Sequence, residues 1–314
     1  MAPSLAAELK LNGTLGSIQL ATMLTSTLYG ITVLQTYVYS RRSSGDALYI
    51  KLAIYALWLL DTLHQAFIFH VSYTYTVTDF GEVLALTHET WSVEGIVIVS
   101  NIMYLGIRSI FCQRIWRLSN KNLWIVSLIM ICSLGDFGAL LAFEIKQKTE
   151  LHLQFLLLRR LSSAFYAAVT FTIVADLLIA ISQTILLWKL RTRVLRTDSI
   201  VRTLILYSIN TGIITAICAL LLCITWAAIP TNLTFIIFFT LLPTLLLNAL
   251  LATFNARQEL REMSSANVIS IPLTPTAQIS STSSPRNNRS YGDTRERVPV
   301  MPIEIKLERS EVIV

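Results

Sequence analysis

Long apolar segments recur along this chain, and they constrain its fold more than any other feature. Seven runs of mostly apolar residues can be marked, at 15–39, 47–71, 91–115, 123–143, 161–188, 203–229 and 232–253. With a rise of about 1.5 Å per residue, helices of this length cross a hydrocarbon layer roughly 30 Å thick. The runs lack the two-residue alternation of barrel strands, and lipid admits only helices or closed barrels. The sequence therefore predicts an all-α fold, a seven-transmembrane helix bundle.

Composition and charge agree with a membrane environment. Of the 314 residues, 54% are hydrophobic and only 14% are charged, which is unusual for a soluble globular domain. The formal net charge of +6 is best explained by basic connections that face anionic lipid. We therefore expect the lipid bilayer as a partner and no nucleic acid.

The distribution of Lys and Arg predicts the orientation of the bundle. Basic residues follow the first, third, fifth and seventh runs, as in Arg41, Arg117, Arg193 and Arg257. The long connector at 72–90 contains no Lys or Arg, and only 144–160, with four basic residues, disagrees. Because cytoplasmic connections carry the excess of positive charge, we expect the N-terminus outside and the C-terminus in the cytoplasm. The plasma membrane is favoured over internal membranes.

Three regions follow from the pattern. Residues 1–14 form a short outer segment, and residues 15–257 form the transmembrane domain. Residues 258–314 are rich in Ser, Thr, Pro and Asn, so we expect a disordered cytoplasmic tail. The basic connections and this tail are the expected contact region for a cytoplasmic partner.

Polar residues inside the apolar runs are the candidate functional residues, because charges in lipid are costly. Asp61, His64, Glu94 and Asp136 are expected in the outer half of the membrane. They predict an outward-opening cavity that binds a ligand or ion. The alternative is that these residues make only structural polar contacts.

A second group of polar residues is expected in the inner half as a buried cluster. It comprises Arg108, Asp176, Asn210 and Asn248. Arg108 and Asp176 should lie nearly level and form a pair, or Arg108 extends alone to the cytoplasmic interface. The two Asn side chains more often join helices by hydrogen bonds than bind ligands.

Metal and redox chemistry have little support in the sequence. All four Cys residues lie in the apolar runs without a C-x-x-C pair, and two of the four His residues, His88 and His152, lie in connections. We therefore expect no metal site, no cofactor and no catalytic residues.

Several motifs together carry a resemblance to a known family. They are "LYGITVLQTYVY", "LWLLDTLHQAF", "FCQRIWRLSNKN", "ADLLIAISQTILLWKLRTRVLRTDSIVRTLILYSINTG" and "LLNALLATFNAR". In this order, over roughly residues 15–258, they resemble a large family of seven-span membrane proteins from basidiomycete fungi, catalogued as a domain of unknown function. The resemblance implies a fold and a lineage but no activity.

Three functions compete on these observations. A receptor-like sensor for a small-molecule ligand fits the seven helices, the outer cavity and the basic cytoplasmic side, although the Asp-Arg-Tyr and Asn-Pro-x-x-Tyr signatures of rhodopsin-like receptors are missing. A small-molecule or lipid transporter would use the same buried charges as a pathway. An intramembrane metal-dependent hydrolase is the weakest alternative, because too few His residues are placed to bind a metal.

Overall fold

The computed structural model describes residues 11–81, 89–150, 161–189, 195–229 and 232–266. These residues form helices, with no strand among them. The long helices are α2 (Leu11–Arg42), α3 (Leu48–Tyr73), α4 (Trp91–Leu118), α5 (Leu123–Glu150), α6 (Ser162–Lys189), α7 (Leu195–Ala228) and α8 (Phe235–Ala266). Seven helices in this part of the chain are long and apolar enough to cross a membrane, which confirms the expected number of spans.

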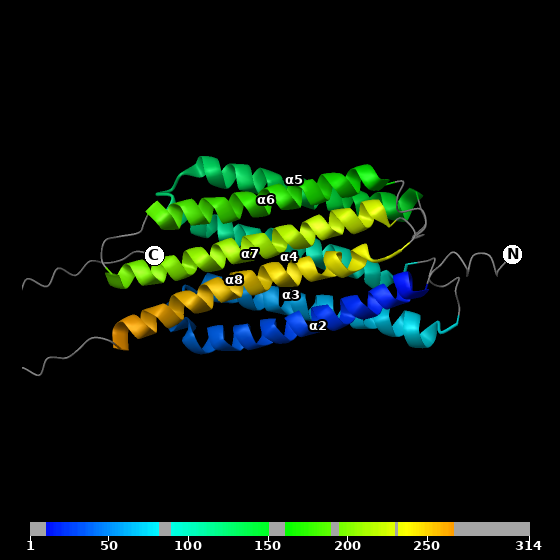
Figure 1. Ribbon diagram of the computed structural model, residues 1–314, viewed down its shortest axis with the longest axis horizontal. Helices are drawn as coiled ribbons and strands as arrows, with labels where there is room; N and C mark the ends of the chain where they lie inside the picture. Colours follow the sequence, from blue (N-terminus) through cyan, green and yellow to red (C-terminus); the bar gives the residue numbers. More distant parts are fainter. Residues whose placement is uncertain (1–10, 82–88, 151–160, 190–194, 230–231, 267–314) are drawn as a thin grey trace, which may run out of the picture. The chain divides into compact units, whose positions relative to one another are not determined.

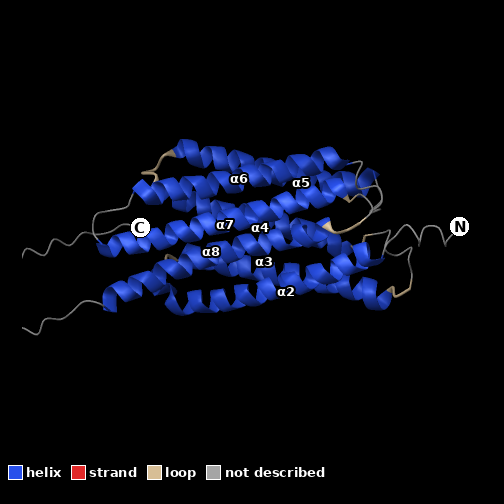
Figure 2. Ribbon diagram, viewed as in Figure 1, coloured by secondary structure: helices blue, strands red, loops and turns tan. Residues whose placement is uncertain are grey.

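The helices lie side by side with nearly parallel axes, and each consecutive pair runs antiparallel (Figure 1). Every helix contacts the next one along the chain, and α8 also packs on α2, so that the first and last helices close a ring. The helix α4 additionally contacts α6 and α8, which places it towards the centre. Figure 2 shows that helix accounts for nearly all of the described chain.

Apolar side chains lie both inside and outside this ring. Met103, Ile107 and Leu247 are completely buried, and they belong to the main core. On the opposite sides of the helices, Ile181 and Leu220 are each more than half exposed. Such a surface is unfavourable in water and favourable against lipid tails, as expected for a multi-pass membrane protein.

Polar contacts hold α2 against α8. Leu233 N donates a hydrogen bond to Gly13 O at 2.9 Å, and Asn255 Nδ2 donates to Gln35 O at the same distance. A Cβ atom at Gly13 would lie 2.3 Å from the side chain of Asn232, so a larger residue here would require that side chain to move. The two helices thus approach closely at one end and are bonded along their length.

Several helices extend beyond the limits expected from hydropathy. The helix α5 continues to Glu150 instead of ending near residue 143, and α8 continues to Ala266 instead of ending near residue 253. Residues 258–266 were expected in the disordered tail; they are helical because "RQELREM", at 257–263, consists of good helix formers. Residues 1–10 and 267–314 lie outside the described residues.

Candidate ligand-binding site

Asp61 and His64 lie one turn apart on α3, and both are buried. Thr244 Oγ1 of α8 donates a hydrogen bond to Asp61 Oδ1 at 2.8 Å. Within the described part of the chain, Asp61 Oδ2 and both ring nitrogens of His64 have no hydrogen-bond partner. Asp61 therefore links α3 to α8, and His64 is a buried imidazole without a polar partner.

The structure does not bring the four expected cavity residues together. Lys148 Nζ contacts Glu94 Oε2 at 2.7 Å, and Arg108 Nη1 contacts Asp136 Oδ2 at 2.5 Å. Each carboxylate, including that of Asp61, has its own partner on another helix. None of the four residues lines the cavity found at one end of the bundle.

Asp136 contacts Arg108 of the expected inner group, and not the other expected outer residues, because α5 is longer than expected. Hydropathy placed the end of this helix near residue 143, only seven residues after Asp136. The helix runs from Leu123 to Glu150, so that Asp136 lies at its middle. At this depth it reaches Arg108, which was expected in the inner group.

The expected pair between Arg108 and Asp176 is present. Arg108 Nε donates to Asp176 Oδ1 at 3.0 Å, and Asp136 is the second acidic partner of the same guanidinium. Arg108 is fully buried, so it does not extend alone to the interface. The ring of Tyr104 lies 5.1 Å from the guanidinium, where a cation–π contact adds to the ion pairs.

The charges of this triad do not balance. One guanidinium faces two carboxylates, which gives a net charge of −1 when both acids are ionised (+1 − 2). The groups come from α4, α5 and α6, whose contacts bring the three side chains together. A buried pair of this kind fixes helix positions more than it adds stability, because burial of charges is itself unfavourable.

The two Asn residues of the expected inner cluster have different positions. Asn248 is buried; it donates to Leu28 O and accepts a hydrogen bond from Thr32 Oγ1, each at 3.1 Å. It joins α8 to α2, which confirms the interpretation as an interhelical contact. Asn210 is exposed on α7, so its assignment to a buried cluster was wrong. Hydropathy located it within a span but could not determine which side of α7 faces outward.

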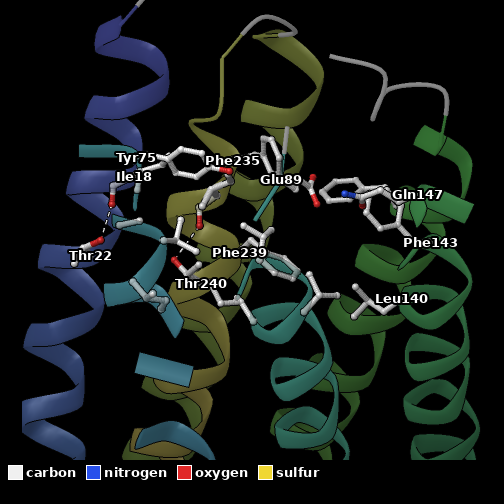
Figure 3. Close-up of a pocket in the computed structure, with 18 residues that line it drawn as sticks. Ile18, Thr22, Tyr75, Glu89, Leu140, Phe143, Gln147, Phe235, Phe239 and Thr240 are labelled. Atoms are coloured by element: carbon white, nitrogen blue, oxygen red, sulfur yellow. Dashed lines mark hydrogen bonds between the residues drawn. The ribbon is translucent and has the colours of Figure 1, made fainter. Parts of the chain in front are cut away.

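A cavity of about 70 Å³ lies at the end of the bundle where α2, α4 and α8 begin. Its wall is mainly apolar and includes Phe143, Phe165, Phe235 and Phe239 (Figure 3). At about 10–15 Å³ for each water-sized group, this space holds about five to seven such groups. An apolar wall with few polar groups is typical of small-molecule sites.

Three of the polar groups of the cavity lie at its mouth. They are Tyr75, in the short helix Thr74–Thr78 after α3, Glu89, which precedes α4, and Gln147 of α5; Thr22 and Thr240 are the other polar lining residues. The Tyr75 hydroxyl accepts hydrogen bonds from Thr90 N at 3.3 Å and Thr90 Oγ1 at 3.2 Å. Figure 3 shows the carboxylate of Glu89 facing Gln147.

Glu89 has an unusual acidity for a carboxyl group. Burial raises the pKa of Glu89 to about 8, and the carboxylate of Glu144 contributes to this rise. A hydrogen bond from Gln147 opposes the rise in pKa, and Glu94 adds a smaller increase. At neutral pH this side chain is therefore largely protonated.

An aromatic cluster lies directly behind the cavity wall. The rings of Phe165 and Trp226 are stacked, with centroids 3.8 Å apart and planes inclined by 15°. Phe235 meets Trp226 edge-on, with centroids 4.8 Å apart. Because Phe165 and Phe235 line the cavity and Trp226 touches both, Trp226 is positioned to report on what the cavity contains.

The comparisons with known proteins identify part of the chain. Residues 172–259 match DUF6534, a family of unknown function. This DUF6534 segment begins within α6, includes α7 and most of α8, and contains Asp176 and Asn248. No curated protein and no solved structure matches the chain. The match agrees with the resemblance to a family without assigned activity.

Sequence reasoning missed the acidic residues at the cavity mouth. Glu89 and Glu144 both fell just outside the expected spans, in connectors at 72–90 and 144–160. A usable signal was present: Leu140, Phe143 and Gln147 are spaced by three and four residues and lie on one face of a continued helix.

Proposed function

We propose that this protein is a receptor-like sensor for small, mainly apolar molecules that bind in the cavity at the beginning of α2, α4 and α8. The observation that carries the proposal is the cavity itself, with its apolar wall and a polar mouth at one end of the bundle. An apolar ligand would gain about 0.8 kcal/mol for each buried methylene group. The proposed role is binding, with no catalytic step.

The one-sided position of the cavity supports sensing over transport. Its lining residues all come from the same end of the helices, from Ile18 on α2 to Phe239 on α8. Further along the bundle, Met103 and Leu247 are completely buried in the core. Packed side chains of this kind transmit a change at one end better than they conduct a solute.

The proposed orientation places the cavity on the outer side of the plasma membrane. The opposite end carries basic residues at or just after the ends of α2, α4 and α6, including Arg42, Lys121 and Lys189. A cytoplasmic partner with an acidic surface would meet the sensor at this basic end.

Transport is the second candidate function. It is favoured by the triad of Arg108, Asp136 and Asp176, because charged groups within a membrane often mark a solute pathway.

The first test measures binding of hexan-1-ol to the protein in lipid nanodiscs, and the fluorescence of Trp226 is the readout. The signal of this residue is isolated by subtracting the spectrum of the Trp226→Phe variant. We expect saturable binding that weakens at least about tenfold in Ala21→Leu, because three added carbon atoms occupy about half of the cavity. The matched control is Ala66→Leu, on an exposed position of α3, which should bind as the unmodified protein does.

A second measurement separates sensing from transport. Hydrogen exchange of the turns at Ser43–Gly45 and 119–122, at the far end of the bundle, should change when hexan-1-ol binds. Binding without any change at these turns would contradict the sensor and favour the transporter. Absence of saturable binding in the unmodified protein would contradict the proposed cavity itself.

A further inference from the structure

Three carboxyl groups lie beside the cavity, and one of them, Glu89, lines it. Glu89 precedes α4, Glu94 lies in the first turn of α4, and Glu144 lies near the end of α5. Glu89 faces Gln147, which lies one turn after Glu144 on α5 (Figure 3), and the charges of Glu94 and Glu144 both act on Glu89. Lys148 is paired with Glu94 at 2.7 Å, but its side chain is 63% exposed. Among the described residues, the exposed Lys148 is the cation paired with these three acids.

Glu144 is the decisive residue of this acidic trio, Glu89, Glu94 and Glu144. Its side chain is more than nine-tenths buried, with 8% of its surface exposed. Among the residues that the structure describes, neither of its carboxylate oxygens has a hydrogen-bond partner. A buried acid without a hydrogen-bond partner is unfavourable, and none of the described residues supplies one to Glu144.

The acidic trio adjoins the apolar cavity. Glu89 belongs to both, since it lines the cavity and the charge of Glu144 acts on it. Gln147, one turn after Glu144 on α5, also lines the cavity. A molecule in the cavity that extends a positive group past Glu89 would therefore reach Glu144.

We propose that the cavity selects molecules with a short apolar body and a primary ammonium group, with the ammonium group bound by Glu89 and Glu144. This inference rests on the proposed function, because it names the ligand class of the same cavity. An ammonium group has three donors and one positive charge, which match the unsatisfied oxygens of Glu144 and the carboxylate of Glu89. The apolar body would have about five to seven atoms, the number that the cavity holds.

A metal ion fits this position less well than an organic cation. In the described part of the chain no three His, Cys, Asp or Glu residues are arranged to hold a metal ion. The cavity beside the acidic trio is also apolar, and an alkyl chain fills it where a hydrated ion would not.

The test compares three probes of equal chain length in nanodiscs: hexylamine, hexan-1-ol and hexanoate. We expect hexylamine to bind more tightly than hexan-1-ol and hexanoate to bind weakest. Glu144→Gln should weaken hexylamine binding at least about tenfold and leave hexan-1-ol binding unchanged, because it removes only a charge-assisted contact. Empty nanodiscs correct for partition of each probe into lipid.

Two further variants keep the test decisive if Glu144→Gln fails to fold. Lys148→Gln removes the cation that pairs with Glu94 and should strengthen hexylamine binding. The matched control Lys146→Gln, exposed on the same helix, should change it little. Equal affinities for hexylamine and hexan-1-ol, or no change in Lys148→Gln, would overturn the ammonium inference while the apolar cavity stands. No saturable binding of any probe would instead overturn the proposed function.

Discussion

At the scale of single residues, the charged groups buried in the bundle determine which substitutions it tolerates. Arg108 is fully buried and is paired with both Asp136 and Asp176. Removing its guanidinium leaves two buried carboxylates without their cationic partner, so Arg108→Met should lower the free energy of unfolding by about 3–5 kcal/mol. Thermal unfolding in detergent measures this loss, and Arg41→Met, at an exposed position, is the control.

Neutralising the acids tests whether the loss arises from the pair. When Asp136→Asn and Asp176→Asn are added to Arg108→Met, part of the stability should return, because no uncompensated charge remains. Strictly additive losses in the three substitutions would show that the groups do not interact.

Glu89 should make stability depend on pH. Its pKa is raised from 4.5 to about 8 by burial and by Glu144, while Gln147 opposes the rise. In the unfolded chain the group ionises near its ordinary pKa, so between about pH 4.5 and 8 the folded state binds more protons. The free energy of unfolding should therefore fall as the pH rises through this window. Thermal unfolding across this range measures the slope.

The charged neighbours of Glu89 define the controls for that measurement. Glu94 on α4 and Glu144 and Lys148 on α5 act in the same region, so Glu89→Gln should reduce the slope without removing it entirely. Saturating hexylamine should flatten the slope as well, because an adjacent ammonium group favours the ionised carboxylate. If Glu89→Gln leaves the slope of stability against pH unaltered, the pH dependence arises from another group.

At the scale of helices, close approach between α6 and α7 depends on a glycine. A Cβ atom at Gly212 would lie 2.6 Å from the Cβ atom of Ala180, a contact that a rigid methyl group cannot relieve. We expect Gly212→Ala to separate the two helices and destabilise the bundle by about 1–3 kcal/mol. The matched control is Gly138→Ala on α5, where no atom lies within 4 Å of the added carbon. That variant should be neutral or slightly more stable in the same unfolding assay, because Ala favours helix.

At the scale of the whole molecule, orientation in the membrane is the prediction with the widest consequence. The distribution of Lys and Arg predicts an outer N-terminus and a cytoplasmic C-terminus. A tag after Val314 should therefore become accessible to antibody only after cells are permeabilised, while a tag before Met1 should be accessible on intact cells. The reverse pattern would place the cavity on the cytoplasmic side and contradict a sensor of external molecules.

The sequence by itself determined the class of fold and the number of spans. Apolar runs of sufficient length leave helices as the favoured spanning structure, so 15–39 and the six later runs predicted the seven helices found. It also predicted the pair of Arg108 and Asp176 as one of two alternatives, because a charge in lipid favours a partner and the two residues are nearly level; the structure contains this pair. These results follow from length, polarity and depth, which are local properties of the chain.

Only the tertiary structure decided which side of each helix faces its neighbours and where each helix ends. Hydropathy could not distinguish exposed Asn210 from buried Asn248, because both lie in apolar runs and differ only in helix rotation. Nor could it show that α5 continues past residue 143, which moves Asp136 to the triad and brings Glu144 to the cavity mouth. The contacts of a site come from residues far apart in sequence, and helix packing, which no single segment encodes, brings them together.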